Sequence, residues 1–314
     1  IGKNTVAARL EGVYDELQEG VSPRVSAIAN YANSDGTFGI SVGGGYERLR
    51  NRTYSELSYG AETGVESAKN VDYNVDGDRA DRYAFDHAQS YYVTMGVRER
   101  YSAIGGFQWK PSDGVELYGD ILYTRLKDSA DQYDAATRFT NIAPARAGAP
   151  FGVRSSTIDT GFNDKLLGGA QGFLTELDAD GVDLRADRQP YVNRNSIVSG
   201  AMGAKYDADR FHLNIEGSYS RGVATRETSQ ASALARASVK IARPDGLGGQ
   251  PTLTFQRGFD HLDPTNFNFV LIARNNNYSR DSIYNGKVDL AYDVGDGFIK
   301  NIRAGVAYSD RKLF

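Results

Sequence analysis

Apolar and polar residues alternate along most of this chain, and a period of two is typical of β-strands with one apolar and one polar face. The clearest case is the strand predicted at residues 37–47. Every second position from Phe38 to Tyr46 is apolar, aromatic or Gly, and the positions from Gly39 to Glu47 on the other face are Gly, Ser or Glu. The same alternation predicts eight further strands, at residues 5–14, 24–31, 100–109, 115–124, 198–206, 211–219, 284–293 and 302–309. Helical periodicity is almost missing, so the pattern predicts an all-β chain.

The connections between the predicted strands have two sharply different lengths. Four are tight and rich in Asn, Asp, Gly and Pro, at residues 33–36, 111–114, 207–209 and 295–297. Long polar stretches alternate with them, at residues 48–90, 127–195 and 222–281. Outer-membrane β-barrels have short periplasmic turns on one side and long extracellular loops on the other. The pattern therefore predicts part of an antiparallel, up-and-down transmembrane β-barrel.

One long loop contains a further strand signal. Residues 238–242 and 252–256 each alternate, and the Pro-Asp-Gly-Leu-Gly-Gly run at 244–249 lies between them. Two alternating segments around such a run predict a β-hairpin on the loop side.

Aromatic residues on the apolar faces gather at the two ends of the predicted strands. At the loop end we expect membrane-interface aromatics at Tyr14, Tyr46, Tyr123, Tyr219 and Tyr308, and at the turn end at Trp109, Tyr206 and Tyr292, beside Phe38 and Phe211. Amphipathic rings at two levels are the girdles of a membrane protein. The alternative is a half-buried sheet of a soluble protein, because Tyr also favours strands. The polar opposite faces favour the membrane.

Charged residues occupy the other face of the same strands. A Lys or Arg on the lipid face near the midplane would cost about 2–4 kcal/mol, so we expect these residues to face a lumen. There they pair with one another and with water, or contact a passing substrate. The predicted lumen-facing charges are Arg9, Glu11, Arg24, Arg98, Arg100, Asp120, Lys205, Glu216, Lys287, Asp289 and Arg303.

Composition narrows the chemistry further. The 314 residues include 35 Gly and 20 Tyr but no Cys, which excludes disulfides, thiolate nucleophiles and cysteine metal sites. Lys and Arg number 36 against 40 Asp and Glu, without a basic block, so we expect no nucleic-acid partner. No run of about 18 apolar residues predicts a membrane helix. No nucleophile motif stands out, and we expect neither an enzyme nor a cofactor.

Two metal-binding patterns need separate mention. His87, His212 and His261 share no metal-ligand spacing. Residues 72–77 match the first half of an EF-hand calcium loop, but the twelfth position is Tyr83 instead of the bidentate Glu. A weak calcium site and a solvated acidic loop both remain open.

Three stretches resemble a known family. They are EGVYDELQEGVSPRVSAIANY (11–31), GGFQWKPSDGVELYGDILYTRLKD (105–128) and NGKVDLAYDVGDGFIKNIRAGVAYSDR (285–311), and QWKPSD (108–113) and GVAYSDR (305–311) are the most specific pieces. They resemble the barrel of TonB-dependent outer-membrane receptors. The resemblance implies a 22-stranded barrel in the outer membrane of a Gram-negative bacterium. Its lumen holds an N-terminal plug domain, and the inner-membrane TonB complex drives uptake of a scarce nutrient such as an iron chelate, a corrinoid or a glycan.

Residues 1–314 are then one partial barrel domain, and we expect the plug, the TonB box and the remaining strands to lie outside them. The other expected partners are the lipid bilayer and lipopolysaccharide. In the loop at 127–195 cations and aromatics suit an anionic or sugar-like ligand, and the candidates are Arg138, Phe139, Arg154, Phe162, Arg188 and Tyr191. The alternative function is a passive porin or a structural barrel without a plug.

Overall fold

The computed structural model describes residues 4–58, 61–65, 71–86, 88–138, 152–161, 169–245, 250–295 and 298–314. Thirteen strands join there into one sheet, so the all-β prediction is confirmed. The helical content of the same residues is one 3-10 turn, η4 (Pro264–Asn266). Within these ranges no helix is long and apolar enough to cross a membrane.

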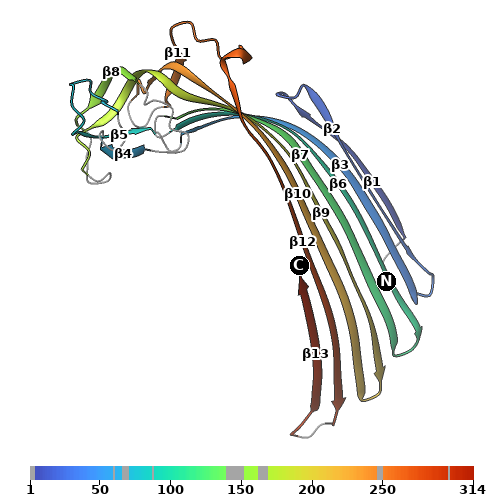
Figure 1. Cartoon of the computed structure of the whole chain (residues 1–314). Coiled ribbons are helices and arrows are strands. Elements are labelled where there is room, and N and C mark those ends of the chain that lie inside the picture. Colours follow the sequence, from blue (N-terminus) through green and yellow to red (C-terminus); the bar gives the residue numbers. More distant parts are fainter. Residues whose placement is uncertain are drawn as a thin grey trace.

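Nine long strands form the main path of the sheet, in chain order and each antiparallel to the next (Figure 1). They are β1 (Thr5–Asp15), β2 (Gly20–Ala32), β3 (Phe38–Ser58), β6 (Ala88–Ser112), β7 (Val115–Arg138), β9 (Phe173–Ala208), β10 (Phe211–Ala242), β12 (Asn268–Asp293) and β13 (Asn301–Leu313). Each contains one of the nine predicted segments, except that Thr37 of the segment at 37–47 precedes β3. Among the described residues the sheet is open, because β1 pairs only with β2 and β13 only with β12.

Four short strands lie at the end of the sheet far from the tight turns (Figure 1). They are β4 (Ala61–Val65), β5 (Arg82–Asp86), β8 (Gly152–Asp159) and β11 (Thr252–Phe255). β8 pairs with β9, and β5 touches β9 through one parallel pair. β11 pairs with the end of β10 from Val239↔Phe255 to Ala242↔Thr252, which confirms the predicted hairpin. We call these strands and the adjoining ends of β9 and β10 the distal unit.

The distal unit has the main hydrophobic core of the described chain. Its buried side chains come from residues 71–85, β9 and β10, and they include Tyr73, Phe85, Leu177, Val182 and Val239. Phe255, Phe259 and Phe267 pack against this core from the β11 side. In contrast, no other described part of the chain forms a second layer over the nine long strands between the tight turns and the distal unit (Figure 1).

The prediction that residues 48–90, 127–195 and 222–281 are loops is wrong for much of their length. β3 continues to Ser58, β7 to Arg138 and β10 to Ala242, while β9 begins at Phe173. At about 3.3 Å per residue, the 36 residues of β9 span roughly 120 Å. Alternation marks a strand only where its two faces meet different surroundings. Between the loop-side aromatics and the distal unit, these extensions are held by backbone pairing and carry mostly polar side chains on both faces, so their sequence has no clear period of two. The far ends of β9 and β10 differ, because they pack into the core of the distal unit.

The tight turns depend on residues that tolerate a left-handed backbone. Gly36 has φ +66° and Gly114 has φ +78°, a region that costs other residues about 1–2 kcal/mol. The Asn33 side chain accepts hydrogen bonds from the Thr37 and Phe38 backbone N–H groups, at 2.9 and 2.8 Å. These bonds close the β2–β3 turn and set the register of the hairpin.

Gly114→Ala is expected to destabilise the protein by more than about 2 kcal/mol, and Gly36→Ala by only about 1 kcal/mol. Both positions have a positive φ, but a Cβ on Gly114 would lie 2.0 Å from the Asp207 carbonyl oxygen, whereas nothing lies within 4 Å of one on Gly36. Denaturant titration of both variants measures the difference. Equal losses would show that the β6–β7 turn shifts away from Asp207 without cost.

Candidate functional site

The register of the long strands places their charged side chains on one face of the sheet, which we call the polar face. Residues directly opposite each other in an antiparallel ladder point to the same side. Glu11 pairs with Arg24, Arg24 with Glu47, and Glu47 with Arg100. Followed to β13, the pairing puts on this face Arg9, Glu11, Arg24, Arg98, Arg100, Asp120, Lys205, Glu216, Lys287, Asp289 and Arg303. That this face lines a lumen stays a prediction.

The opposite face, which we call the apolar face, carries the aromatic residues. By the same register these are Tyr14, Tyr46, Trp109, Tyr123, Tyr206, Tyr219, Tyr292 and Tyr308. The rings of Tyr219 and Tyr284 lie 4.8 Å apart between centroids on neighbouring strands. Large apolar side chains on this face are exposed, with Met202 at 66% and Val306 at 69%. Apolar surface of this kind marks contact with a partner or a membrane.

Ion pairs run across the strands on the polar face near β1. Arg24 Nη1 lies 3.5 Å from Glu11 Oε2, and its Nε lies 3.2 Å from Glu47 Oε2. Arg9 also contacts Glu11. These side chains are partly exposed, so each pair contributes at most about 1 kcal/mol. Their main effect is that each arginine on this part of the polar face has a glutamate beside it, so neither charge is left unneutralised.

A second network lies nearer to the tight turns, around Glu116. Its carboxylate accepts a hydrogen bond from Gln108 at 3.0 Å and lies 3.6 Å from Lys110 Nζ and 3.5 Å from Lys205 Nζ. The Lys205 ammonium also lies 5.0 Å from the centre of the Tyr118 ring. The Tyr118 hydroxyl donates to Glu216 at 2.9 Å. Six polar groups from four strands are thus already connected to one another.

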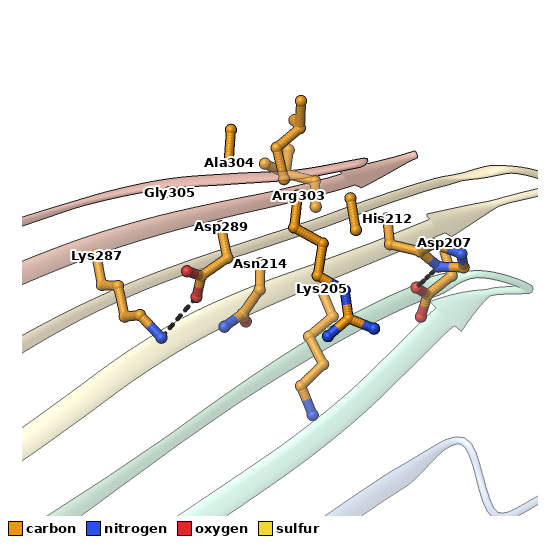
Figure 2. A pocket seen from close by; sticks show the side chains of 12 residues that line it. Lys205, Asp207, His212, Asn214, Lys287, Asp289, Arg303, Ala304 and Gly305 are labelled. Carbon is orange, nitrogen blue, oxygen red and sulfur yellow. Dashed lines mark hydrogen bonds and ion pairs between the residues drawn. The ribbon is translucent and has the colours of Figure 1, made fainter. Parts of the chain in front are cut away.

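A hollow of about 490 Å³ lies on the polar face over β9, β10, β12 and β13. Figure 2 shows the side chains of Lys205, Asn214, Asp289 and Arg303 projecting from the same side of these strands. Lys287 Nζ lies 2.7 Å from Asp289, and His212 contacts Asp207 at 2.7 Å and Asp293 at 3.2 Å. Among the described residues, no carboxylate pairs with Arg303.

These contacts suit reversible polar binding. Most charges in the hollow already have a partner of opposite charge. A polar ligand can therefore exchange hydrogen bonds with these groups without leaving an unpaired charge. Arg303 is the exception and is available for an anionic group. The sequence singled out Lys205, Lys287, Asp289 and Arg303. Asp207 was interpreted as a turn residue, and His212 was considered only as a metal ligand, so their contact was missed.

Of the predicted loop ligands, the structure describes the side chains of Arg154, Arg188 and Tyr191, and their role in ligand binding stays a prediction. Arg188 and Tyr191 lie three residues apart in an unbroken part of β9, so they point to opposite faces. Arg188 contacts Asp131 at 3.2 Å and lies 5.7 Å from the centre of the Tyr133 ring. Arg138 ends β7, its side chain lies outside the description, and so do Phe139 and Phe162.

Arg154, the remaining candidate, belongs to an ion-pair cluster that sequence reasoning missed. It lies on β8 and contacts Asp180 of β9. Arg257 follows β11 and contacts Asp178 at 2.6 Å and also Asp180, which accepts a further hydrogen bond from Ser238 at 2.5 Å. Arg257 has φ +56° and Gly258 has φ +71°. The cluster therefore connects β8 and the strained end of β11 to β9 by ion pairs. In the sequence, only the Arg-Gly pair at 257–258 indicated an unusual backbone at this place.

Desolvation raises the pKa of Asp180, but hydrogen bonds from Ser238 and Arg154 and the charge of Arg257 outweigh it and leave this pKa below its ordinary value. A lowered pKa stabilises the folded state above the ordinary aspartate pKa. That stability is lost as the pH falls through the lower, folded-state pKa. Below pH 4 we therefore expect faster amide exchange in β8 and β11, after correction for intrinsic rates. Asp180→Asn is expected to show this faster exchange at pH 7 and to lose most of the pH dependence; an unchanged profile would contradict the assignment.

The acidic loop has a compact arrangement of its own. Carboxylate oxygens of Asp76, Asp78 and Asp81 lie within 4.8 Å of one another. The Asn74 amide donates to Asp76 and to Asp81, both at 2.7 Å. Asp72 accepts from the Val75 and Gly77 backbone N–H groups. These bonds hold the turn without an ion, and the calcium hypothesis stays untested.

Comparisons of the chain with known protein families, with curated proteins and with solved structures found no match. The resemblance to TonB-dependent receptors therefore rests on the residues quoted above. Function has to be argued from the two faces of the sheet.

Proposed function

We propose that this chain is part of the wall of an outer-membrane β-barrel that belongs to a TonB-dependent receptor and imports a scarce nutrient. The observation that carries the proposal is the pair of aromatic levels on the apolar face. On four strands the two levels are eight residues apart: Phe38 and Tyr46, Tyr101 and Trp109, Phe211 and Tyr219, and Tyr284 and Tyr292.

Eight residues correspond to about 26 Å along a strand. Between the two levels, the apolar face of the nine long strands carries no charged residue in the described structure. Outer-membrane barrels have an outward apolar band about 25 Å tall between aromatic girdles. In a soluble sheet no bilayer thickness sets the distance between aromatic residues on an exposed face, so a constant spacing is not expected.

The loop-side aromatic level also crosses the ladder at an angle. One row of paired residues joins Leu10, Tyr46 and Arg280, and backbone hydrogen bonds extend it to Phe314. Tyr14 lies four residues to the loop side of this row, and Tyr308 six residues to its turn side. From β1 to β13 the aromatic level therefore shifts by ten residues along the strands, or about 33 Å. The two strands are eight strand spacings apart, or about 38 Å. The level therefore has a slope of about 40° relative to the row. Strands in membrane barrels tilt by about 35–45°.

The unpaired edges of β1 and β13 support a barrel with more strands than these nine. Unpaired backbone groups are not tolerated in the hydrocarbon region, yet β1 and β13 each have one free edge within the described residues. Further strands therefore have to complete the barrel. Active import is inferred from the resemblance at residues 108–113 and 305–311, and the polar face would then line the lumen against the plug.

Two measurements test the proposal. The full-length protein should sediment with outer membranes and change gel mobility on heating; recovery as a soluble protein with constant mobility would refute the barrel. Uptake of labelled iron chelates, corrinoids and glycans should then require the TonB complex. Uptake that persists without that complex would identify a passive porin.

A further inference from the structure

The apolar face changes character abruptly just beyond the loop-side aromatics. On β3, β6, β7, β10 and β12 we considered the two positions of this face that follow the aromatic toward the distal unit. Six of these ten positions are cations and one, Glu99, is an acid. On β13 the two positions that follow Tyr308 are Asp310 and Lys312, which pair with each other at 3.7 Å. We call the six residues the cation band: Arg48, Arg50, Arg125, Lys127, Arg221 and Arg280.

The turn-side edge of the sheet has the opposite charge. The described residues at the tight turns include five carboxylates, Asp35, Asp113, Asp207, Asp209 and Asp293, against three cations, Lys110, Arg210 and Lys300. Water solvates either sign equally well, so solvation alone does not explain cations at one edge and acids at the other.

The cations of the band are poorly neutralised by protein. Glu99 is shared between Arg48 at 3.8 Å and Lys127 at 3.7 Å. Among the described residues, no carboxylate pairs with Arg125 or Arg221. The Nε groups of Arg221 and Arg280 are buried and have no hydrogen-bond partner there. Guanidinium groups without a carboxylate or hydrogen-bond partner favour a ligand with anionic oxygen atoms.

We propose that the cation band binds the phosphate groups of phosphorylated glycolipids in the outer leaflet. This inference rests on the proposed function, because it requires the apolar face to lie in a membrane. Two positions beyond the aromatics span about 13 Å along a strand, or about 10 Å across the membrane at the slope found above. The band then lies at the level of the lipid headgroups, where a bidentate guanidinium matches a phosphate. A free phosphate ion would not need cations spread over four strands on a lipid-facing surface.

The test is a titration of the purified full-length protein with a bisphosphorylated lipid A disaccharide, followed by native mass spectrometry. Arg125→Gln/Arg221→Gln removes two unpaired cations of the band. The matched control, Arg188→Gln/Arg274→Gln, removes two cations from the same face farther toward the distal unit. Arg274 lies ten residues beyond Tyr284, and Arg188 pairs with Ala231, twelve residues beyond Tyr219. At about tenfold or less per cation near a membrane surface, the band variant is expected to bind the glycolipid roughly 10- to 30-fold more weakly, and the control within about twofold of wild type.

The dephosphorylated glycolipid is expected to bind weakly to all three proteins. Equal binding by the band variant and wild type, equal loss in both variants, or tight binding without phosphates would each overturn the inference. Heat-modifiable mobility is measured first on every variant. A wild-type protein that fails that measurement refutes the membrane barrel itself, whereas a barrel that inserts but ignores the phosphates refutes only the cation band.

Discussion

Met202→Lys is expected to destabilise the membrane-inserted sheet by about 2–4 kcal/mol, while Ala201→Lys changes its stability by less than about 0.5 kcal/mol. The two positions are adjacent on β9 but point to opposite faces. Met202 lies on the exposed apolar face, four residues from Tyr206, where a lysine would have to enter lipid. Ala201 lies on the polar face opposite Asp120, which favours a new cation.

Urea titration of the full-length protein in lipid vesicles measures this difference. Trp109 lies at the turn-side aromatic level and contributes to the tryptophan fluorescence, which follows the departure of the nine long strands from lipid. Equal stabilities of the two variants would contradict the membrane assignment of the apolar face. A larger loss for Ala201→Lys would reverse the assignment of the faces.

Phe85→Ala is expected to destabilise the distal unit by about 3–5 kcal/mol, the usual range for a buried phenylalanine. Phe85 is 2% exposed, and its ring stacks on Tyr73 with 4.9 Å between centroids. Limited proteolysis should then cut residues 71–86 much faster, while the nine long strands stay resistant. This separation is expected because the core lies outside the belt between the aromatic levels, so the distal unit can open locally.

Val75→Ala is the matched control, because Val75 is exposed in the same segment and makes no contribution to the core. We expect its cleavage rate to stay within about twofold of wild type. If Phe85→Ala also leaves the cleavage rate unchanged, the distal unit is not held by this core. If the variant unfolds the long strands as well, the distal unit and the wall form one cooperative unit.

The distal unit changes the picture of ligand capture. Long loops would have to be ordered by a ligand, at an entropic cost for every residue that becomes fixed. Strands that extend beyond the aromatic level, with β8 and β11 fastened by Asp180 and Arg257, are ordered beforehand. Under the proposed function, a nutrient would first meet this folded surface and then the polar face below it.

Period-two alternation was sufficient to place all nine long strands, because between the aromatic levels one face must be apolar and the other polar. The tight turns could be predicted equally well, since Gly36 and Gly114 have backbone conformations that few other residues adopt and the Asn33 side chain accepts the hydrogen bonds that close its turn. The hairpin at residues 238–256 was predicted for the same reasons. Each of these features depends on neighbours in the sequence or on one repeated environment.

The extent of the strands could not be predicted in this way. Beyond Tyr46, β3 continues through Arg48 and Arg52 to Ser58 because its backbone pairs with β6, and pairing leaves no mark on the side-chain pattern. The surroundings of the ligand candidates could not be predicted for a related reason. Arg154 and Arg188 looked available in a loop, but each has a carboxylate partner on another strand, Asp180 or Asp131.

The sequence by itself determined the faces: which side of each strand is apolar, where the aromatic residues lie along it, and where the chain turns. Only the tertiary structure decided the level of each residue relative to residues on neighbouring strands, because register fixes how far one strand is shifted against the next. Only with that register do separate tyrosines become a level inclined by about 40°, and scattered arginines a band beside it. Alternation is a property of one strand, whereas register is a property of a pair.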